Sequence, residues 1–552
     1  MEIKDYIVFL CYFVIVAGYG LYIYYKKKSA SGDSKDYFLA EGSLTWWAIG
    51  ASLIASNISA EQFIGMSGSG FKIGLAIATY EWMAAATLIV VAVFFLPVYL
   101  KNKIFTMPQF LSVRYNSTVS MIMAVFWLLL YIVVNLTSIL FLGALAVSSI
   151  SGLDFQLCMI GLAVFAIIIT LGGMKVIGYT DVIQVFFLIL GGLATTYLAL
   201  NLVSEHFGGQ GVLEGFNIVH EKASDHFHMI LKPDNPNYID LPGLSVLIGG
   251  MWVINLSYWG CNQYITQRAL GADLPTARNG LLFAAVLKLL MPLIVVLPGI
   301  AAYVLYNDGE FQQEMLAGGE LNPDRAYPVL LSLLPTGLKG LSFAALTAAV
   351  VASLAGKANS VATIFSLDIY QKIFDKNASE KRLVNVGKIT IIVSMILAII
   401  IAPHLGIDKK GGFQYIQEYT GFVSPGIFAM FLLGFFWKRT TSNAALFATI
   451  GGFLMSIVLK FLPKFMDLSF LASTGFSVPV NGVYEIPFID RVGFVFIFCL
   501  IGMYIISIIE NKRGIVPNGL EVDKSMFKTN TSFAIGALLV LGITAALYTI
   551  FW

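Results

Sequence analysis

Long apolar runs recur along the whole chain, and they restrict its fold more than any other feature. A helix needs about 20 residues to cross a hydrocarbon core of about 30 Å. Fourteen runs are long enough, near residues 5–25, 44–67, 74–100, 118–150, 155–174, 180–203, 242–267, 280–306, 335–371, 383–403, 412–437, 440–462, 488–510 and 532–552. We therefore expect an all-α polytopic membrane protein embedded in a lipid bilayer.

The composition agrees with a membrane protein. The chain is 58% hydrophobic and only 12% charged, whereas a soluble domain carries roughly 25% charged residues. The net charge of +2 does not suggest nucleic-acid binding. The four cysteines lie in apolar segments, which indicates buried side chains rather than disulfides or a zinc site. The sequence shows no nucleophile beside a base, so we do not expect an enzyme.

The basic residues predict an orientation. Lys and Arg are enriched in short cytoplasmic loops, and here they cluster in alternate loops, as at Lys26 to Lys28 and Lys372 to Arg382, although Lys409 and Lys410 oppose the trend. This pattern places both termini outside a plasma (inner) membrane. The larger polar insertions, 204–241 and 306–334, then lie on the outer side, where we expect short surface helices.

A polar stretch interrupts the second apolar run. The sequence Trp46 to Ile54 leads into Asn57-Ile58-Ser59-Ala60-Glu61-Gln62 before apolar residues resume at Phe63. An unsatisfied polar group costs several kcal/mol in hydrocarbon, so this stretch must face protein or water. It predicts a broken transmembrane helix at a binding site.

The run 242–267, five spans later, contains a similar stretch from Asn255 to Tyr264. Because five is an odd number, two five-helix units would have opposite orientations in the membrane. Paired interrupted segments in an inverted repeat point to a substrate site at the membrane midplane. Two polar helices packed only for structure are the alternative.

Five polar side chains in these spans supply hydrogen-bond donors and acceptors of both kinds, as a neutral polyhydroxylated solute requires. They are Gln62, Glu81, Asn255, Lys288 and Gln417. Inserting one charged residue costs about 2.5–3.5 kcal/mol, so the two charged members should face the interior. An ion pair that fixes helix packing is the alternative reading.

Aromatic residues near these polar groups could cover the apolar face of a sugar ring. Tyr80, Tyr258 and Phe413 are the candidates, although aromatic residues are common in this chain and more often belong to the core.

A segment rich in small residues, 346–356, permits close helix packing. Opposite a broken helix, freed carbonyls and one hydroxyl would also suit Na⁺. Asp181 could cap a helix N-terminus, or it could draw cations toward an inner exit.

Several motifs resemble those of the sodium/solute symporter family, and in particular its bacterial sodium/galactose (glucose) branch. They are Asn57 to Gly68, Tyr80-Glu81-Trp82, Thr180 to Gln184, Phe413 to Gly421 and Ser424-Pro425-Gly426. The resemblance extends over essentially the whole chain.

The resemblance implies a LeuT-type 5+5 inverted repeat with about 14 transmembrane helices. Residues 1–43 would form an extra N-terminal helix and cytoplasmic loop. The two repeats would occupy 44–204 and 242–437, with an outer loop at 205–241 between them. Three C-terminal helices would follow in 438–552.

The resemblance also implies residue roles. Gln62, Glu81, Asn255, Lys288 and Gln417 would bond sugar hydroxyls. Tyr258 would stack on the sugar as an inner gate held by Asn57. Met66, Tyr80 and Phe413 would close the outer side.

The implied sodium ligands are the carbonyls of Ala55, Ile58 and Ala349 and the hydroxyl of Ser353. Asp181 would line the inward route of the ion.

Three positions depart from the family pattern. Ala84 and Ala352 replace serines, although the Ala352 backbone could still coordinate Na⁺. Lys357 lies one turn beyond Ser353, roughly 6 Å from the ion site. It could weaken Na⁺ binding, pair with Asp181 or point elsewhere.

The expected function is sodium-coupled symport of a neutral hexose by alternating access. The alternatives are symport of a nucleoside, amino acid, polyol or sialic acid, and a weakly coupled or sodium-independent sugar carrier or sensor.

Overall fold

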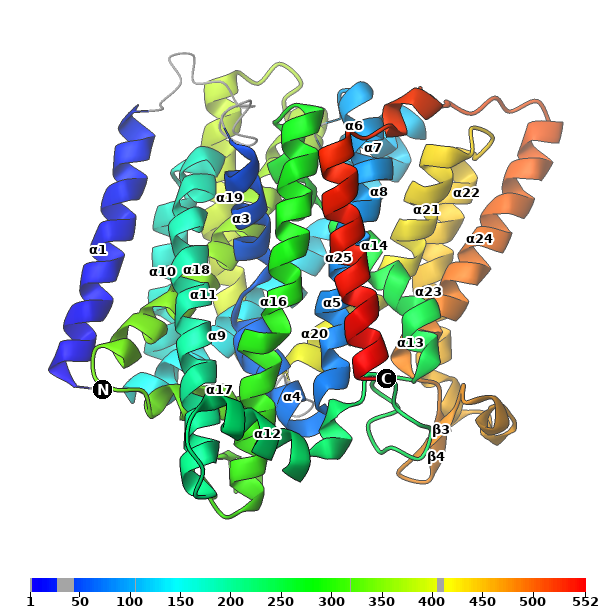
Figure 1. Cartoon of the computed structure of the whole chain (residues 1–552). Coiled ribbons are helices and arrows are strands. Elements are labelled where there is room, and N and C mark those ends of the chain that lie inside the picture. The colour runs from blue at the N-terminus through cyan, green and yellow to red at the C-terminus, as the bar shows by residue number, and fades with distance from the viewer. Residues whose placement is uncertain (1, 27–43, 105, 318, 405–411) are drawn as a thin grey trace. The chain divides into compact units, whose positions relative to one another are not determined.

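The computed structural model describes residues 2–26, 44–104, 106–317, 319–404 and 412–552, and these residues are mostly helical (Figure 1). The chain forms two compact units. The first unit comprises residues 1–78, 128–228 and 286–416, and the second comprises 79–127, 229–285 and 417–552. Three of the boundaries fall inside the helices Ser117–Leu129, Leu274–Asn307 and Gly412–Gly421, and each unit combines segments from distant parts of the chain.

The spans agree with the expected count of about fourteen. Within the described residues, ten helices are long and apolar enough to cross a membrane, and the bent pair Gly412–Gly421 and Ser424–Phe436 makes up to eleven. The other three predicted runs contain the shorter helix Phe155–Thr170 and two interrupted segments. The all-α polytopic prediction is therefore confirmed.

The first unit contains most of the interrupted and deeply buried helices. Its main elements are α1 (Ile3–Lys26), α3 (Trp46–Asn57), η1 (Glu61–Met66), α4 (Ser67–Ile73), α9 (Thr137–Ser151), α10 (Phe155–Thr170), α11 (Gly173–His206), α12 (Val212–Lys222), α16 (Leu274–Asn307), η6 (Pro323–Arg325), α17 (Ala326–Ser332), α18 (Leu338–Thr363), η7 (Ile364–Phe374) and α19 (Glu380–Ile401). The helix α16 enters this unit at Val286, and α20 (Gly412–Gly421) begins in it.

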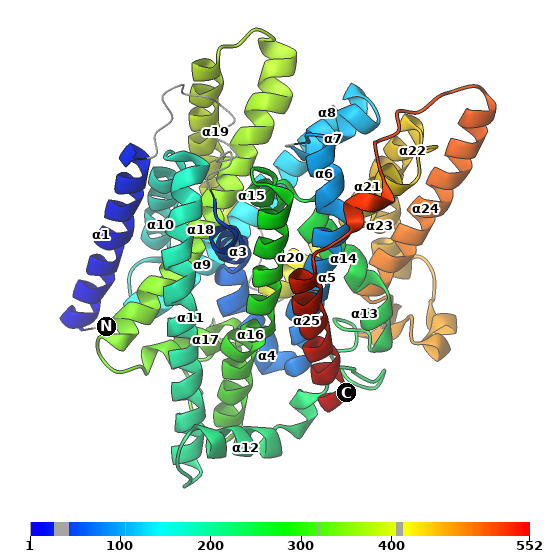
Figure 2. The same cartoon turned by 45° about the horizontal axis from the view of Figure 1, so that its top comes forward.

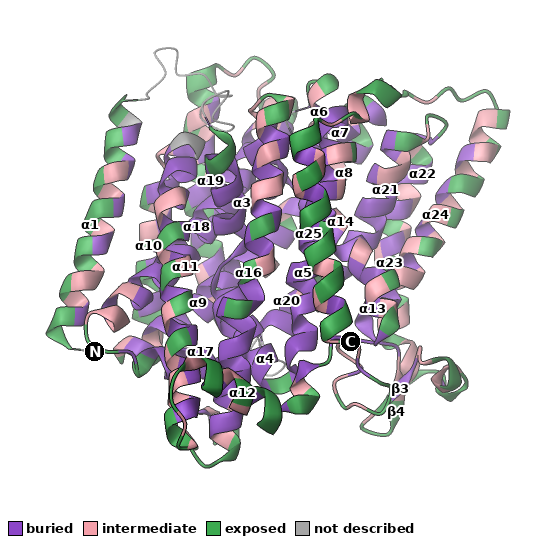
Figure 3. Ribbon diagram, viewed as in Figure 1, coloured by how far each residue is buried: buried purple, intermediate pink, exposed green. Residues whose placement is uncertain are grey.

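Helix α18 is the centre of the first unit. It contacts α1, α3, α9, α10, α11 and α19, and α3, α11 and α18 lie side by side in both views (Figures 1 and 2). Every residue of α18 from Ser342 to Thr363 is buried, whereas α1 exposes apolar side chains along its length (Figure 3). Exposed apolar residues on a membrane-spanning helix are suited to contact lipid.

The second unit contains the remaining helices. They are α5 (Thr79–Val90), η3 (Val91–Phe95), α6 (Leu96–Lys101), α7 (Met107–Arg114), α8 (Ser117–Leu129), α13 (Leu244–Ile248), α14 (Gly250–Cys261), α15 (Gln263–Leu270), α21 (Ser424–Phe436), α22 (Ser442–Leu446), α23 (Gly452–Phe461), α24 (Phe488–Lys512) and α25 (Thr531–Ile550). Helix α14 contacts α5, α21 and α24.

A buried arginine closes the end of α21. The Arg114 guanidinium donates to the carbonyls of Gly434, Trp437 and Thr440 at 2.7, 2.9 and 3.0 Å. The last carbonyls of a helix have no partner within it, and a cation there is also favoured by the helix dipole. Arg114 therefore stabilises the C-terminal end of α21.

The insertion 204–241 contains a short helix, α12, as expected. The described residues also form two short antiparallel hairpins, which we did not expect. In one, β1 (Leu316–Ala317) pairs with β2 (Glu320–Leu321), and in the other β3 (Val478–Val480) pairs with β4 (Val483–Glu485).

Candidate functional site

The first predicted break is present in the structure. Helix α3 ends at Asn57, and Ile58 is extended, with φ −81° and ψ 110°. The chain becomes helical again at the π-helix η1, which begins at Glu61. The polar stretch in the second apolar run therefore does interrupt a helix.

A capping box starts the helix after this break. The Glu61 N–H donates to the Ser59 hydroxyl at 3.2 Å, and the Gln62 side-chain oxygen accepts the Ser59 N–H at 3.1 Å. Ser-x-x-Gln is a recognised helix-start pattern, so the sequence contained this signal and we missed it. This bond uses one lone pair of the Gln62 side-chain oxygen, so its second lone pair and both amide hydrogens are left for the predicted sugar contact.

Two glycines allow close contacts beyond the break. A Cβ on Gly65 would lie 2.7 Å from the Phe413 backbone nitrogen, and one on Gly68 would lie 2.4 Å from an Asp324 carboxylate oxygen. Asp324 also accepts the Gly412 N–H at 2.8 Å. The predicted outer-gate residues Met66 and Phe413 are both buried, on elements that meet at Gly65.

Asp324 is a buried carboxyl group outside the membrane-spanning segments. Burial raises its pKa to about 7, although the hydrogen bond from Gly412 and the charge of Lys72 act in the opposite direction. Our sequence analysis did not identify this residue, because nothing in its local sequence indicates that a loop carboxyl group is buried.

Lys288 reaches the end of α3. Its ammonium donates to the Asn57 side-chain oxygen, and it is 1% exposed. The implied contact of Asn57, in the first unit, with Tyr258, in the second, stays a prediction. Within the first unit, Asn57 bonds to Lys288 from α16. This pair places one predicted sugar-binding group directly at the break.

The predicted sodium ligands lie on two contacting helices of the first unit. The Ser353 hydroxyl of α18 donates to the Ser56 carbonyl of α3 at 3.0 Å. Ser56 lies beside the predicted ligand Ala55 and two residues before Ile58, while Ala349 and Ala352 are within one turn of Ser353. These positions are all buried.

Asp181 lies in the interior of α11, not at a helix start. This helix begins at Gly173, and a dipole effect fades beyond the first turn, so the capping interpretation of Asp181 is wrong. The Ser52 hydroxyl, one turn before Ser56 on α3, donates to the Asp181 carboxylate at 2.6 Å. The carboxylate therefore lies on a helix that packs against both α3 and α18.

Lys357 points to the predicted sodium ligand. Its ammonium donates to the Ser353 hydroxyl at 3.0 Å, and its charge acts on the buried Glu61 carboxylate. This bond brings Lys357 to the predicted ion site, while its effect on Na⁺ binding and a pairing with Asp181 both stay predictions.

The donor chemistry of this site fits Na⁺. Carbonyl, hydroxyl and carboxylate oxygens are the ligands of hard cations. Within the described part of the chain, no group of three or more His, Cys, Asp or Glu side chains could hold a metal ion.

The second break is displaced from its predicted position. Helix α14 runs without interruption through Asn255, whose amide donates to the Met251 carbonyl at 3.2 Å within the same helix. The interruption falls at Asn262, which is extended, with φ −106° and ψ 125°. A break at Asn255 was therefore wrong, although Asn262 belongs to the same polar stretch.

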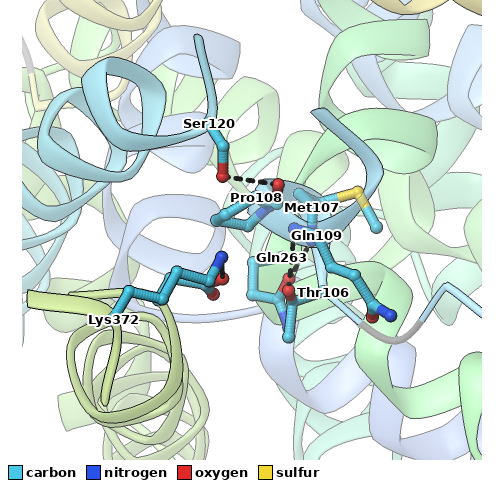
Figure 4. A network of polar contacts seen from close by, with 8 residues as sticks. Thr106, Met107, Pro108, Gln109, Ser120, Gln263 and Lys372 are labelled. Atoms are coloured by element: carbon cyan, nitrogen blue, oxygen red, sulfur yellow. Dashed lines mark hydrogen bonds and ion pairs between the residues drawn. The ribbon is translucent and has the colours of Figure 1, made fainter. Parts of the chain in front are cut away.

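Neutral groups of the second unit satisfy the second break. The Tyr99 hydroxyl donates to the Gly260 carbonyl at 2.6 Å, and the Met107 N–H donates to the Gln263 side chain at 2.7 Å (Figure 4). Gln263 also donates to Gln267 at 3.1 Å. Both glutamines are fully buried.

The ten candidate sugar residues are divided equally between the units. Gln62, Lys288, Asn57, Met66 and Phe413 belong to the first, and Glu81, Asn255, Gln417, Tyr258 and Tyr80 belong to the second. Their grouping into one sugar site stays a prediction.

Within the second unit, Glu81 is 2% exposed and shares a face of α5 with the buried Ala84. The Tyr258 ring meets those of Trp259 and Tyr264 edge-on. Gln417 is partly buried on α20.

A polytopic all-α fold that contains a broken membrane-spanning helix is typical of secondary transporters. A model of the sodium:solute symporter family matches residues 37–452, and the chain belongs to this family. It is therefore a sodium-coupled solute symporter and not an enzyme, with Na⁺ as its coupling ion.

Individual relatives support this assignment. The chain is 47% identical to a sodium/glucose cotransporter of Vibrio parahaemolyticus, over 99% of this chain and 98% of that one. It is 34% identical to sodium/myo-inositol cotransporter 2 of Homo sapiens, over 83% of this chain and 70% of that one.

A solved structure of a Na⁺-coupled sialic acid symporter shares the fold. Its TM-score is 0.75 at 21% identity, covering 92% of this chain and 98% of that one. The predicted LeuT-type fold class is confirmed.

Proposed function

We propose that this symporter imports a neutral hexose, galactose or glucose, together with Na⁺. The observation that carries the proposal is the first break, where a buried ammonium, Lys288, meets the Asn57 amide and where Ser353 contacts the Ser56 carbonyl. Polar donors for hydroxyl groups and oxygen ligands for Na⁺ thus meet at the end of the same interrupted helix. The similarity to a sodium/glucose cotransporter favours a hexose among neutral solutes.

The proposed mechanism is alternating access. Na⁺ held between the end of α3 and Ser353 favours the outward-open state, the sugar then binds, and a conformational change releases both inside. One charge crossing 100 mV provides about 2.3 kcal/mol, and a tenfold Na⁺ gradient about 1.4 kcal/mol. At one-to-one coupling these terms allow roughly 500-fold sugar accumulation.

The residue roles implied by the resemblance are part of this proposal. Gln62, Glu81, Asn255, Lys288 and Gln417 bind hydroxyls, Tyr258 forms the inner gate, and Met66, Tyr80 and Phe413 close the outer side. Ala55, Ile58, Ala349, Ala352 and Ser353 hold Na⁺, and Asp181 lies on its exit route. We further propose the repeats 44–204 and 242–437, a plasma-membrane location and external termini.

A cyclic polyol is the second candidate solute. The similarity to a sodium/myo-inositol cotransporter favours it, and such a solute also needs donors and acceptors around a ring. Ala84 stands where the family pattern has a serine. The alanine removes one possible contact with a solute hydroxyl, which bears on the choice between a hexose and a cyclic polyol.

Uptake by purified protein in liposomes tests the function. With an inward Na⁺ gradient, labelled galactose should accumulate above its external concentration, and unlabelled glucose should compete more strongly than myo-inositol, sialic acid or a nucleoside. Accumulation of another solute would change the substrate, while equilibration without accumulation would contradict coupled transport and favour a carrier or sensor.

Matched variants separate the two sites. Gln62→Ala should weaken sugar binding, and Ser353→Ala should weaken the Na⁺ dependence of uptake by about tenfold or more. Thr363→Val is the control, because this buried hydroxyl on α18 bonds only to the Asn359 carbonyl of its own helix among the measured bonds. An unchanged Na⁺ dependence in Ser353→Ala would contradict the assigned ion site.

A further inference from the structure

Lys357 carries a charge in the most deeply buried helix of the first unit. It is 1% exposed, and its neighbours on α18 are small or apolar. An ammonium group in such surroundings is unfavourable unless fixed partners compensate its lost hydration. The position of those partners therefore indicates what the charge does.

One partner of Lys357 is a proposed sodium ligand. The ammonium donates to the Ser353 hydroxyl at 3.0 Å, and this hydroxyl donates to the Ser56 carbonyl, also at 3.0 Å. A hydroxyl group has one hydrogen and two lone pairs. Ser353 uses its hydrogen toward α3 and a lone pair toward Lys357, so the lysine charge reaches the end of the broken helix through a single oxygen.

Na⁺ and the Lys357 ammonium are competing partners for the same oxygen. Both bind oxygen lone pairs, and two positive charges side by side repel strongly where water is excluded. A sodium ion coordinated by Ser353 therefore requires the ammonium to move away. The buried Glu61 carboxylate, on which the Lys357 charge acts, is a suitable alternative partner.

We propose that Lys357 is a tethered cation that competes with Na⁺ for the Ser353 hydroxyl and thereby sets the Na⁺ concentration at which this symporter loads. The inference rests on the sodium site of the proposed function. In Na⁺-free protein the ammonium holds α18 to α3, and Na⁺ binding displaces it. The chain thus needs more Na⁺ than it would without this charge.

A structural role for Lys357 makes the opposite prediction. If the lysine only stabilised helix packing, its neutral replacement would loosen the site and weaken Na⁺ binding. Competition instead predicts that the neutral replacement binds Na⁺ more tightly. A gain of affinity is therefore the decisive result, because damage to the fold does not produce it.

The test is equilibrium binding of radioactive Na⁺ to purified protein in nanodiscs, without sugar. Lys357→Met should lower the half-saturating Na⁺ concentration by about tenfold, the effect of removing one charged hydrogen-bonding competitor. Lys357→Gln keeps a polar group without charge and should shift it by about threefold. Lys357→Arg keeps the charge and should not lower it.

Lys372→Met is the matched control. This lysine belongs to the helical segment that continues α18, and it forms an ion pair with Asp368 at 2.8 Å. Its removal should leave Na⁺ binding unchanged. Thermal unfolding of each variant shows whether the protein is folded. If Lys357→Met does not fold, the Na⁺ affinity of Lys357→Gln tests the competition instead.

Ser353→Ala separates this inference from the proposed function. If Ser353→Ala loses Na⁺ binding while Lys357→Met and Lys357→Gln bind no more tightly than the original chain, the competition is wrong and the sodium site stands. If Ser353→Ala binds Na⁺ normally, the site assignment itself is wrong. If Lys357→Met binds Na⁺ more tightly and the double variant Lys357→Met, Ser353→Ala loses this gain, both the competition and the sodium site are confirmed.

Discussion

The two broken helices of this protein satisfy their free polar groups in different ways. At the first break, near Ile58, charged side chains and hydroxyls arrive from other helices, including Lys288 and Ser353. At the second, at Asn262, neutral groups such as the Tyr99 hydroxyl bond to the neighbouring backbone, and the buried Arg268 guanidinium donates to a carbonyl of its own helix.

This difference shows that an interrupted helix is not by itself a binding site. Both polar stretches look alike in sequence, and both would be costly in lipid without partners. At the second break, the polar groups already have hydrogen-bond partners within the second unit. At the first, the buried Lys288 and Lys357 ammonium groups lie beside amide, hydroxyl and carbonyl oxygens, and we propose that these groups exchange partners when an ion binds.

The largest effect should follow from Asn57→Ala, which removes an acceptor from the buried Lys288 ammonium. A hydrogen bond to a charged group contributes up to about 3 kcal/mol, so sugar uptake should fall by roughly 100-fold. Initial uptake rates in liposomes measure this loss. Asn102→Ala, which removes a partly buried bond to the Val98 carbonyl and two exposed bonds to the Glu521 backbone, is the control, and equal losses in both variants would contradict a special role for the first break.

The next effect concerns how the stability of the protein depends on pH through Asp324, which packs against Gly68 beyond the first break. The Asp324 pKa is raised to about 7 by burial, so the folded protein binds a proton more tightly than the unfolded chain between the usual Asp value and pH 7. Asp324 therefore contributes to the free energy of unfolding at low pH, and this contribution is lost as the pH rises toward 7.

Asp324→Asn mimics the protonated acid and should remove this dependence. Between pH 5 and pH 8 the original chain should lose about 2 kcal/mol more stability than the variant. Thermal unfolding at both pH values measures the difference. Parallel pH profiles would show that Asp324 is not the group responsible.

Ser52→Ala should have a moderate effect at the first break. Its hydroxyl donates to the Asp181 carboxylate at 2.6 Å, and this charge-assisted bond should be worth about 1.5 kcal/mol, or about tenfold in Na⁺ affinity. Radioactive Na⁺ binding provides the measurement. Ser456→Ala is the control, because that buried hydroxyl bonds to the Gly452 carbonyl of its own helix.

The smallest effect should come from the second break. Tyr99→Phe removes the bond to the Gly260 carbonyl, which should reduce the free energy of unfolding by about 1 kcal/mol. Na⁺ affinity should not change. If Na⁺ binding weakened as much as in Ser52→Ala, the distinction between a structural and a functional break would fail.

Much of the fold could be predicted from local sequence. The fourteen apolar runs correspond to the helical segments, since length and hydropathy are properties of consecutive residues. The break after Asn57 was predictable because polar residues lie between two apolar stretches. The capping pattern of Ser59 and Gln62 was equally local, and we overlooked it.

The second break was placed seven residues too early for a physical reason. Asn255 is polar, but its amide bonds within its own helix, so the helix continues. The helix ends at Asn262, where Tyr99 and Met107 provide partners from far away in the chain. Local polarity cannot reveal which residue has such partners.

The sequence by itself determined that this chain is a polytopic membrane protein of the sodium:solute symporter family, with a helix broken after Asn57. Only the tertiary structure decided that Lys357 bonds to Ser353, that Asp181 bonds to Ser52 and that Asp324 is buried. Span positions follow from runs of neighbouring residues, whereas these contacts depend on side-chain direction and on helices that meet only after packing. The charge balance of the ion site is therefore a property of the folded protein.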